Sequence, residues 1–428
     1  MEHDLVEDSA LDISNGIGLY IHIPFCATKC WYCDFNTYSG IQHIVPEYLV
    51  ALMNEIETWG TLLQRPVVNT VFIGGGTPSL LTPEQMGALM VSVKNAFSLK
   101  KHAEITAETN PDDITSDLLD GFINSGINRL SMGVQSLDNS LLQVLGRRHN
   151  AQTAIQAFHC IKEKGFADVN LDLMYGLPYQ TLEQWSKTLD EALKMEPDHI
   201  SAYCLTLEDG TALKRWVSDE LIQDPDPDLA AEMYLHASAT LDRSGYFGYE
   251  ISNWAQAGHE CLHNLAYWRN TPYLGVGPGA HSYLGSYRFS CENSPVRYIH
   301  KINSWDLSQT SRPGRLDFNK IPQIVSSEFI GFALETAETL VMGLRLADGV
   351  LLNGFKARFG VELLDIYGEV FHDIEKFDLV QHVGHGSEER IVLTSRGRLL
   401  GNEVFWRIID LAQTDVSMQF PDVGDVEN

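Results

Sequence analysis

The feature that most constrains the fold is a regular alternation of short apolar segments and amphipathic segments through the first half of the chain. The apolar segments are rich in β-branched residues and have the length of strands, whereas the intervening segments have helical periodicity. The expected strands span 18–25, 69–75, 104–109, 128–135, 168–176 and 199–206, with a further one at 246–255. The expected helices span 47–63, 83–97, 116–126, 151–165, 182–195 and 226–245. Six strand–helix units in series predict a parallel sheet covered by helices, as an open sheet or as a barrel.

The remaining parts of the chain are less regular. Residues 256–320 are rich in Gly, Pro, Asn and aromatic residues, which predicts an ordered loop that wraps the sheet domain. Helical patterns followed by the strand-like "RIVLT" predict a small α+β domain of winged-helix type. The expected division is a flexible N-terminus (1–17), the sheet domain (18–255), the wrapping extension (256–320), the C-terminal domain (321–418) and an acidic tail (419–428).

Composition limits the partners and the compartment. The chain has 57 acidic and 30 basic residues, and its net charge of −27 argues against nonspecific binding to nucleic acid. The N-terminus is acidic where a signal peptide needs basic residues, and no run of 18 apolar residues predicts a transmembrane helix. The seven cysteines do not form the framework of a secreted disulfide protein, so the expected compartment is the reducing cytoplasm.

Three of these cysteines, Cys26, Cys30 and Cys33, lie within eight positions directly after the first expected strand. Such short spacings bring thiolates to one metal centre. One interpretation is a Cys₃His zinc site, with His22 or a distant histidine as the fourth ligand. The other is a [4Fe–4S] cluster, which normally takes four thiolates, so that three would leave one iron open to another ligand.

Further candidate residues lie near the carboxyl ends of the expected strands, where ligand sites gather in parallel folds. The glycines of "GGGTP" (74–78) allow a backbone to approach a ligand, with N–H and C=O groups for its ammonium or ribose. Carboxylates can accept hydrogen bonds from ribose hydroxyls, and an arginine can grip a carboxylate. The candidates are Glu108, Gln135, Asp172 and Thr206 at or near strand ends, together with Arg147 in "GRRH". Taken singly, each could be a helix cap or a solvated side chain.

The spacing Cys-x₃-Cys-x₂-Cys, with Tyr32 before the last cysteine, resembles the radical S-adenosylmethionine (SAM) superfamily. That resemblance implies a [4Fe–4S] cluster on the three cysteines, whose open iron binds SAM. The motifs "LYIHIPFC", "GGGTPSLL", "ETNP", "SMGVQS", "LGRRH" and "DLMYGLPYQT" resemble the oxygen-independent coproporphyrinogen III oxidase family, and more closely its HemW branch of haem chaperones. The implied fold is a partial (β/α)₆ barrel with a small, mainly helical C-terminal domain.

The same resemblance implies which residues contact SAM. They are Tyr20, Tyr32, Gly75, Gly76, Thr77, Glu108, Gln135, Arg147, Asp172 and, with weaker identity, Thr206. Oxidases of the family carry a fourth cysteine two residues after the third and have a longer N-terminal arm. Here Phe35 takes that position, and only 19 residues precede Tyr20. Both departures favour the chaperone branch over porphyrinogen decarboxylation.

The chaperone branch is implied to bind haem and to pass it to acceptor haem proteins, membrane-associated ones among the candidates, while the cluster needs a reductant. The oxidase and a zinc-binding module without redox chemistry remain the alternatives. Haem iron takes His, Cys, Met or Tyr as axial ligand. The segment "HECLHNLAYW" (259–268) supplies His259, Cys261 and His263 beside aromatic residues, and His281 follows. The expected haem ligands are His263 and His281, although His263 could instead only organise its loop.

Two other cysteines have a simpler interpretation. Cys160 and Cys204 lie in a helix pattern and a strand pattern. A free cysteine packs like a small hydrophobic residue, so both are expected in the core.

Overall fold

The computed structural model describes residues 6–7, 11, 13–307, 311–312 and 315–414. The chain divides into two compact units. The first comprises Met1–Tyr267 and Thr271–Phe329, and the second comprises Trp268–Asn270 and Ile330–Asn428. The second unit therefore begins later than the expected boundary at residue 321, because strand β15 (Ile324–Phe329) pairs with β12 in the sheet of the first unit.

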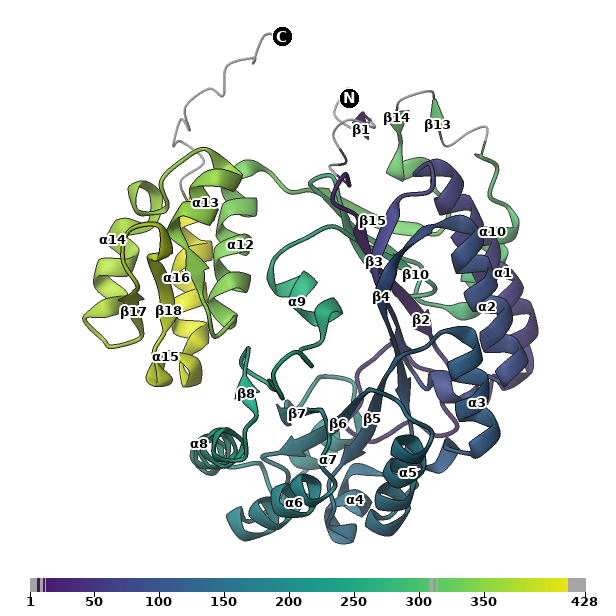
Figure 1. The fold of residues 1–428 in the computed structure, drawn as a ribbon, viewed down its shortest axis with the longest axis horizontal. Coiled ribbons are helices and arrows are strands. Elements are labelled where there is room, and N and C mark those ends of the chain that lie inside the picture. Colours follow the sequence, from purple (N-terminus) through teal and green to yellow (C-terminus); the bar gives the residue numbers. More distant parts are fainter. Residues whose placement is uncertain (1–5, 8–10, 12, 308–310, 313–314, 415–428) are drawn as a thin grey trace. The chain divides into compact units, whose positions relative to one another are not determined.

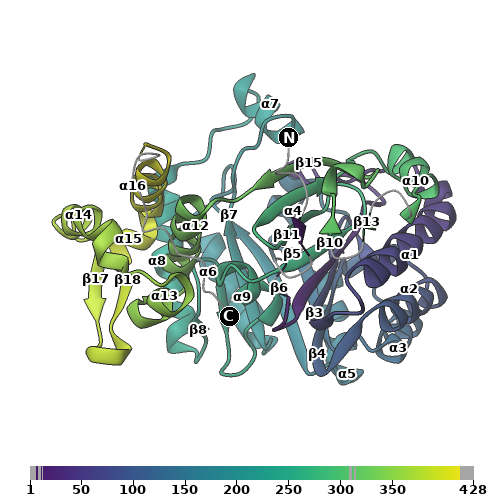
Figure 2. The same cartoon turned by 90° about the horizontal axis from the view of Figure 1, so that it is seen from above.

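The first unit is built on a sheet whose central strands are parallel and whose helices cover its convex face (Figures 1 and 2). The parallel strands are β2 (Ile17–Ile23), β3 (Val67–Gly75), β4 (Ser98–Thr109), β5 (Arg129–Gln135), β6 (Asp168–Tyr175) and β7 (His199–Cys204). The covering helices include α1 (Val45–Leu62), α2 (Pro83–Ala96), α3 (Ser116–Ser125), α5 (Ala151–Glu163) and α6 (Leu182–Lys194). This architecture confirms the prediction of a radical SAM-type α/β fold.

The core of this unit lies between the sheet and the outer helices. Trp59 of α1, Phe122 of α3 and Trp185 of α6 are fully buried there. The strand order runs from β15 at one edge to β8 at the other without closing on itself. The sheet is therefore a partial barrel, open on one side.

Two sequence expectations for the first unit were wrong. Residues 246–255 form not one strand but two short antiparallel ones, β8 (Phe247–Gly248) and β9 (Asn253–Ala255), after helix α8 (Pro227–Arg243). Residues 256–320 are not only a wrapping loop, because β10 (Tyr273–Val276) joins β2 in parallel and β11 and β12 continue the sheet. The further elements are α4 (Asn139–Leu145), α7 (Ala212–Ser218), α9 (Leu262–Trp268), β11 (His281–Leu284), β12 (Tyr287–Cys291) and α10 (Pro295–Asn303).

The N-terminal expectation falls partly outside the described residues, as does the whole acidic tail 419–428. Within the described part, β1 (Val6–Glu7) pairs with β14 (Arg315–Leu316), which also pairs with β13 (Ser311–Arg312). Leu11 is buried, and Ile17 already belongs to β2. These residues are packed rather than flexible.

The second unit is small and mainly helical. A three-stranded antiparallel sheet, in the order β16–β18–β17, packs with its helices. Its elements are α12 (Phe332–Arg345), β16 (Val350–Leu351), α13 (Leu352–Phe359), α14 (Leu363–Glu375), β17 (Val380–Val383), β18 (Arg390–Leu393), α15 (Ser395–Leu399) and α16 (Gly401–Thr414). The winged-helix type stays a prediction. Across both units, no helix in the described ranges has the length and apolarity needed to span a bilayer.

Local sequence signals account for several helix ends. Thr82 and Gln85 form a capping box at the start of α2, and Thr181 and Gln184 form one at the start of α6. Gly126 ends α3 in the left-handed region, with φ of 94°. These ends are set by residues next to them in sequence, which is why they could be predicted.

Replacement of Thr82 by alanine should lower the free energy of unfolding by about 1 kcal/mol, because the Gln85 N–H loses its acceptor at the helix start. Urea-induced unfolding followed by circular dichroism measures this loss. Thr58→Ala is the matched control, since its hydroxyl only donates to the Asn54 carbonyl within exposed helix. Equal losses in the two variants would contradict the role of the cap.

Candidate functional site

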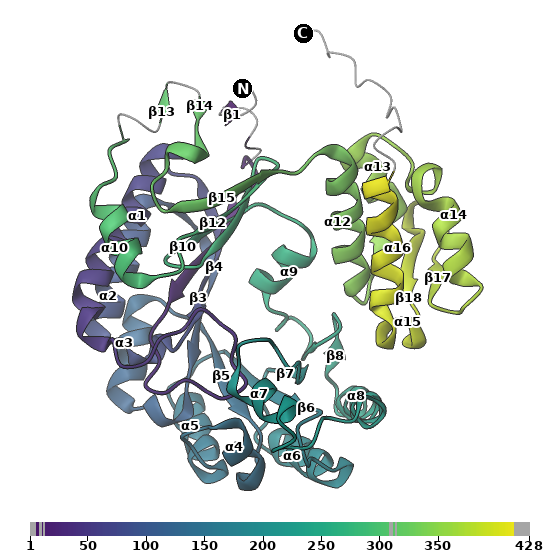
Figure 3. The ribbon, with the colours of Figure 1, turned by 180° about the vertical axis from the view of Figure 1, so that it is seen from behind.

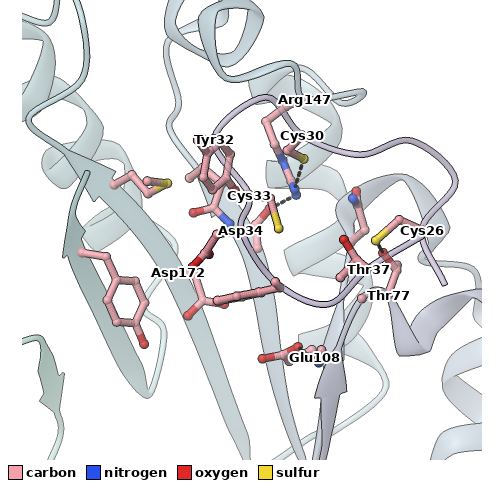
Figure 4. Close-up of a pocket in the computed structure, with 18 of the residues that line it drawn as sticks. Cys26, Cys30, Tyr32, Cys33, Asp34, Thr37, Thr77, Glu108, Arg147 and Asp172 are labelled. Atoms are coloured by element: carbon pink, nitrogen blue, oxygen red, sulfur yellow. Dashed lines mark hydrogen bonds between the residues drawn. The ribbon is translucent and has the colours of Figure 1, made fainter. Parts of the chain in front are cut away.

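A cavity of about 460 Å³ lies at the carboxyl ends of the parallel strands. The loop after β2 carries the three cysteines into it, and the ends of β3 to β7 supply the rest of the wall (Figure 4). Cys26, Cys30 and Cys33 line this cavity, as do all the predicted SAM contacts except Tyr20: Tyr32, Gly75, Gly76, Thr77, Glu108, Gln135, Arg147, Asp172 and Thr206. Residues that span most of the first unit in sequence therefore meet at one place.

The three thiols are free and differ in their partners. The Thr77 hydroxyl donates to Cys26 Sγ at 3.4 Å, and Arg147 Nη1 donates to Cys30 Sγ at 3.3 Å (Figure 4). Burial raises the pKa of Cys33 to about 11. Burial also raises the pKa of Cys26, against hydrogen bonds from Thr77 and Thr37. Cys26 and Cys33 thus hold their protons at neutral pH and need a bound cation to become thiolates.

Arg147 is the cation closest to the thiols in this wall. Its Nη2 donates to the Gly133 carbonyl at 2.5 Å, so the guanidinium is fixed between β5 and the cysteine loop. Its Nε is buried and has no hydrogen-bond partner within the described residues. Burial lowers the pKa of Arg147, but Tyr32 and Cys30 outweigh that effect and raise it overall. The side chain is permanently charged and one of its donors is unused.

Two carboxyl groups, Glu108 and Asp172, lie deeper in the cavity (Figure 4). Burial, then the charge of Asp172, raise the pKa of Glu108 to about 7, against the Gly75 N–H that it accepts at 2.9 Å. Burial also raises the pKa of Asp172, opposed by hydrogen bonds from Ser131 and Asn170 at 3.0 and 2.8 Å. Both groups are costly to bury as anions, which is typical of functional sites.

Loss of the Glu108 carboxyl should change how stability depends on pH. A raised native pKa means that the folded chain binds the proton more tightly, so its contribution is full below about pH 4.5 and is lost as pH rises through about 7. Between pH 5 and 8 the cluster-free wild type should lose about 3 kcal/mol relative to Glu108→Gln, by urea unfolding at each pH. Asp172→Asn should move this loss to lower pH, because it removes the second cause of the shift. Parallel wild-type and Glu108→Gln curves would contradict the raised pKa.

The glycine run at the end of β3 departs from expectation. Its N–H groups do not face a ligand, because Gly75 donates to Glu108 and Gly76 donates to the Ile23 carbonyl at 2.8 Å. A Cβ on Gly76 would lie 2.6 Å from the Phe25 carbonyl oxygen. Glycine is thus required for contact with the strand before it, and only carbonyl oxygens of the run are left to accept from an ammonium group.

Tyr20 and the two histidine candidates lie in adjoining cavities that share Glu108 with the main one. His263 is buried, and its ring nitrogens bond to Thr70 Oγ1 at 2.8 Å and to the Tyr267 hydroxyl at 3.0 Å. Its burial lowers the pKa to about 3. His281 is exposed in a cavity of about 320 Å³ that Tyr20 and Phe35 also line. His263 is therefore held inside the protein, whereas His281 is accessible.

Some functional positions were misassigned or missed. Cys204 is not a core residue but is exposed and lines the main cavity, whereas Cys160 is partly buried against the core. Tyr203 lines both the main cavity and the one beside it. Its position near the end of β7 could have indicated it, by the rule that identified Asp172. No sequence signal marks Thr37, which hydrogen-bonds Cys26 from beyond the cysteine motif.

Comparisons with known proteins place this geometry in a family. The radical SAM superfamily model matches residues 20–192, and the HemN C-terminal domain model matches residues 335–400. The protein named heme chaperone HemW of Bacillus subtilis (strain 168) is 35% identical over 387 residues, which cover 90% of this chain and 97% of that protein. The HemW of Mycobacterium tuberculosis (strain H37Rv) is 36% identical over 390 residues, or 90% and 93%. The chain belongs to the HemW family.

A solved structure supports the fold of this HemW-family chain. The coproporphyrinogen III oxidase HemN of Escherichia coli, titled a radical SAM enzyme, superposes with a TM-score of 0.79 at 24% identity. The match covers 94% of this chain and 92% of that one. At that identity the likeness establishes the shared fold and not the shared reaction.

The site of this HemW-family chain fits the cofactors that the superfamily name implies. Within the described ranges, no three His, Cys, Asp or Glu side chains are grouped so that they could hold a single metal ion. The three thiols instead line a cavity of about 460 Å³ beside Arg147, with its unused donor, and the two carboxyl groups. Soft thiolate ligands around a larger space suit an iron–sulfur cluster with a polar ligand next to it.

Proposed function

We propose that this chain is a haem chaperone that holds a [4Fe–4S] cluster on Cys26, Cys30 and Cys33, binds SAM beside it and transfers haem to acceptor proteins. The observation that carries the proposal is the meeting of three thiols with the SAM-type residues in one cavity, in a chain that matches HemW proteins over almost their whole length. The cluster would supply one-electron chemistry when bound.

The residues around the cluster have distinct roles in this proposal. Arg147 pairs with the SAM carboxylate, for which a guanidinium donor is suited. The carbonyl groups of the Gly75–Thr77 turn accept from the SAM ammonium. Glu108 and Asp172 accept from the ribose hydroxyls at the deep end of the cavity.

Phe35 distinguishes this proposal from the alternative, an oxygen-independent coproporphyrinogen III oxidase. It stands where oxidases of the family carry a fourth cysteine. It is 59% exposed and lines both the main cavity and the cavity of His281. An exposed aromatic ring between these cavities suits contact with a flat apolar macrocycle such as haem.

Of the two candidate haem ligands, His281 can offer a ring nitrogen without breaking a side-chain hydrogen bond found in the described residues. His263 would first have to release Thr70 or Tyr267. In a haem titration followed by absorbance, His281→Ala should therefore weaken binding strongly, and His263→Ala should retain it if the fold is intact by circular dichroism. The opposite result would move the haem to the cavity around His263.

The function itself is tested by haem transfer. Cluster-loaded protein should bind haem and deliver it to apo-haem proteins, and it should yield no protoporphyrinogen from coproporphyrinogen III with SAM and a reductant. Turnover of coproporphyrinogen III would establish the oxidase instead. Zinc without acid-labile sulfide after anaerobic purification would establish the zinc-binding alternative.

A further inference from the structure

The peptide groups of Trp31, the residue between Cys30 and Tyr32, are held by two segments far away in sequence. The Trp31 N–H donates to the carbonyl of Leu145, the last residue of α4, at 3.2 Å. The Trp31 carbonyl accepts from the Leu213 N–H, in the first turn of α7, at 2.9 Å. The turn that carries the second and third cysteines is therefore fixed by contacts outside the cysteine loop.

The Trp31 side chain is held by the same two segments. Its ring packs edge-on against Trp216 of α7, with centroids 4.8 Å apart and planes at 76°. It also lies against Gly146, where a Cβ would come within 2.8 Å of the indole. Trp31 is 40% exposed, so these are the contacts that hold its ring in place. Figure 3 shows α7 beside the loop after β2.

A small apolar cluster supports α7 from below, separate from the main core. Its buried members come from α4, from the ends of β6 and β7, and from α7 itself: Leu141, Leu145, Met174, Leu177, Leu205 and Leu213. Tyr32 and Trp216 pack against it as partly buried members. The cluster gives α7 a fixed base, so that Trp216 is a rigid partner for Trp31 rather than a mobile surface residue.

We propose that Trp216 is a positioning residue that acts through Trp31 to hold the Cys30–Cys33 turn ready for the cluster. This inference rests on the proposed function, because the cluster is what the turn would bind. A loop that is ordered in advance loses less conformational entropy when its ligand enters. Trp216 therefore increases the retention of the cluster from a helix that contributes no thiolate.

The first test compares Trp216→Ala and Trp216→Phe with wild type. After anaerobic loading with iron and sulfide, the Trp216→Ala cluster should be lost to a chelator about ten-fold faster, the size of effect typical of residues that orient metal ligands. Trp216→Phe, which keeps a ring, should restore most of the lifetime. Trp406→Ala is the matched control, because Trp406 is 66% exposed on α16 of the second unit. Equal lifetimes for Trp216→Ala and wild type would overturn the proposal.

The second test needs no cluster. In the cluster-free chain, hydrogen exchange of peptides that cover residues 26–33 should be faster in Trp216→Ala and Trp31→Ala, and no faster still in the double variant, because both changes break one contact. Independent, additive effects would overturn the proposal. If wild type takes up no iron and sulfide, the proposed function fails, while the exchange experiment still decides whether Trp216 orders the turn.

Discussion

Cys30→Ala should abolish assembly of the iron–sulfur cluster. With one thiolate removed from three, the cube would have two irons without protein ligands, and Arg147 would lose the sulfur to which it donates at 3.3 Å. Iron and acid-labile sulfide after anaerobic reconstitution should fall to background, as should the visible absorbance of the cluster.

Two other thiols in the chain serve as controls for this experiment. Cys160→Ala changes a partly buried helical thiol, and Cys204→Ala changes an exposed thiol that lines the same cavity. Both should load as wild type does. Loss of the cluster in Cys204→Ala would identify a fourth protein ligand and would remove the open iron on which SAM binding depends.

Arg147→Ala should weaken SAM binding about 10- to 100-fold, since a hydrogen bond to a charged group contributes roughly 1.5–3 kcal/mol. Isothermal titration of cluster-loaded protein measures the change. Arg147→Lys should not restore the affinity, because an ammonium group cannot bond the Gly133 carbonyl, Cys30 and a carboxylate with the geometry of a planar fork.

The neighbouring Arg148 provides the matched control. It also lines the cavity, but its guanidinium is paired with Asp113 at 2.9 Å. Arg148→Ala should therefore leave the affinity for SAM within about two-fold of wild type, as expected for the loss of a partly exposed ion pair. An equal loss in both variants would mean that general positive charge, and not the placement of Arg147, attracts SAM.

The parts of the structure that could be predicted from sequence are those set by local signals. The strand–helix alternation fixed the order of β2 to β7, and the Thr82 and Thr181 capping boxes fixed two helix starts. Glu108 and Asp172 could be named because parallel strands bring their carboxyl ends to one edge. Each of these inferences needs only residues close in sequence and a general rule of topology.

The parts that could not be predicted depend on long-range pairing. Strand β10 has four residues and no periodic signal of its own, and only its register with β2 makes it a sheet strand. The exposure of Cys204 and the contact between Trp31 and Trp216 likewise depend on how distant segments pack. The internal hydrogen bonds of the glycine run depend on Glu108, thirty-three residues further along the chain.

The pairing of β10 with β2 has a consequence for biosynthesis. The first strand of the sheet receives its second neighbour only from residues 273–276. While the ribosome makes the intervening chain, one edge of β2 lacks its hydrogen-bonding partner, and a bare edge can pair with another nascent polypeptide. The cysteine loop leaves this same strand. Maturation of the metal centre is therefore best timed after translation has passed the barrel, when the edge is covered.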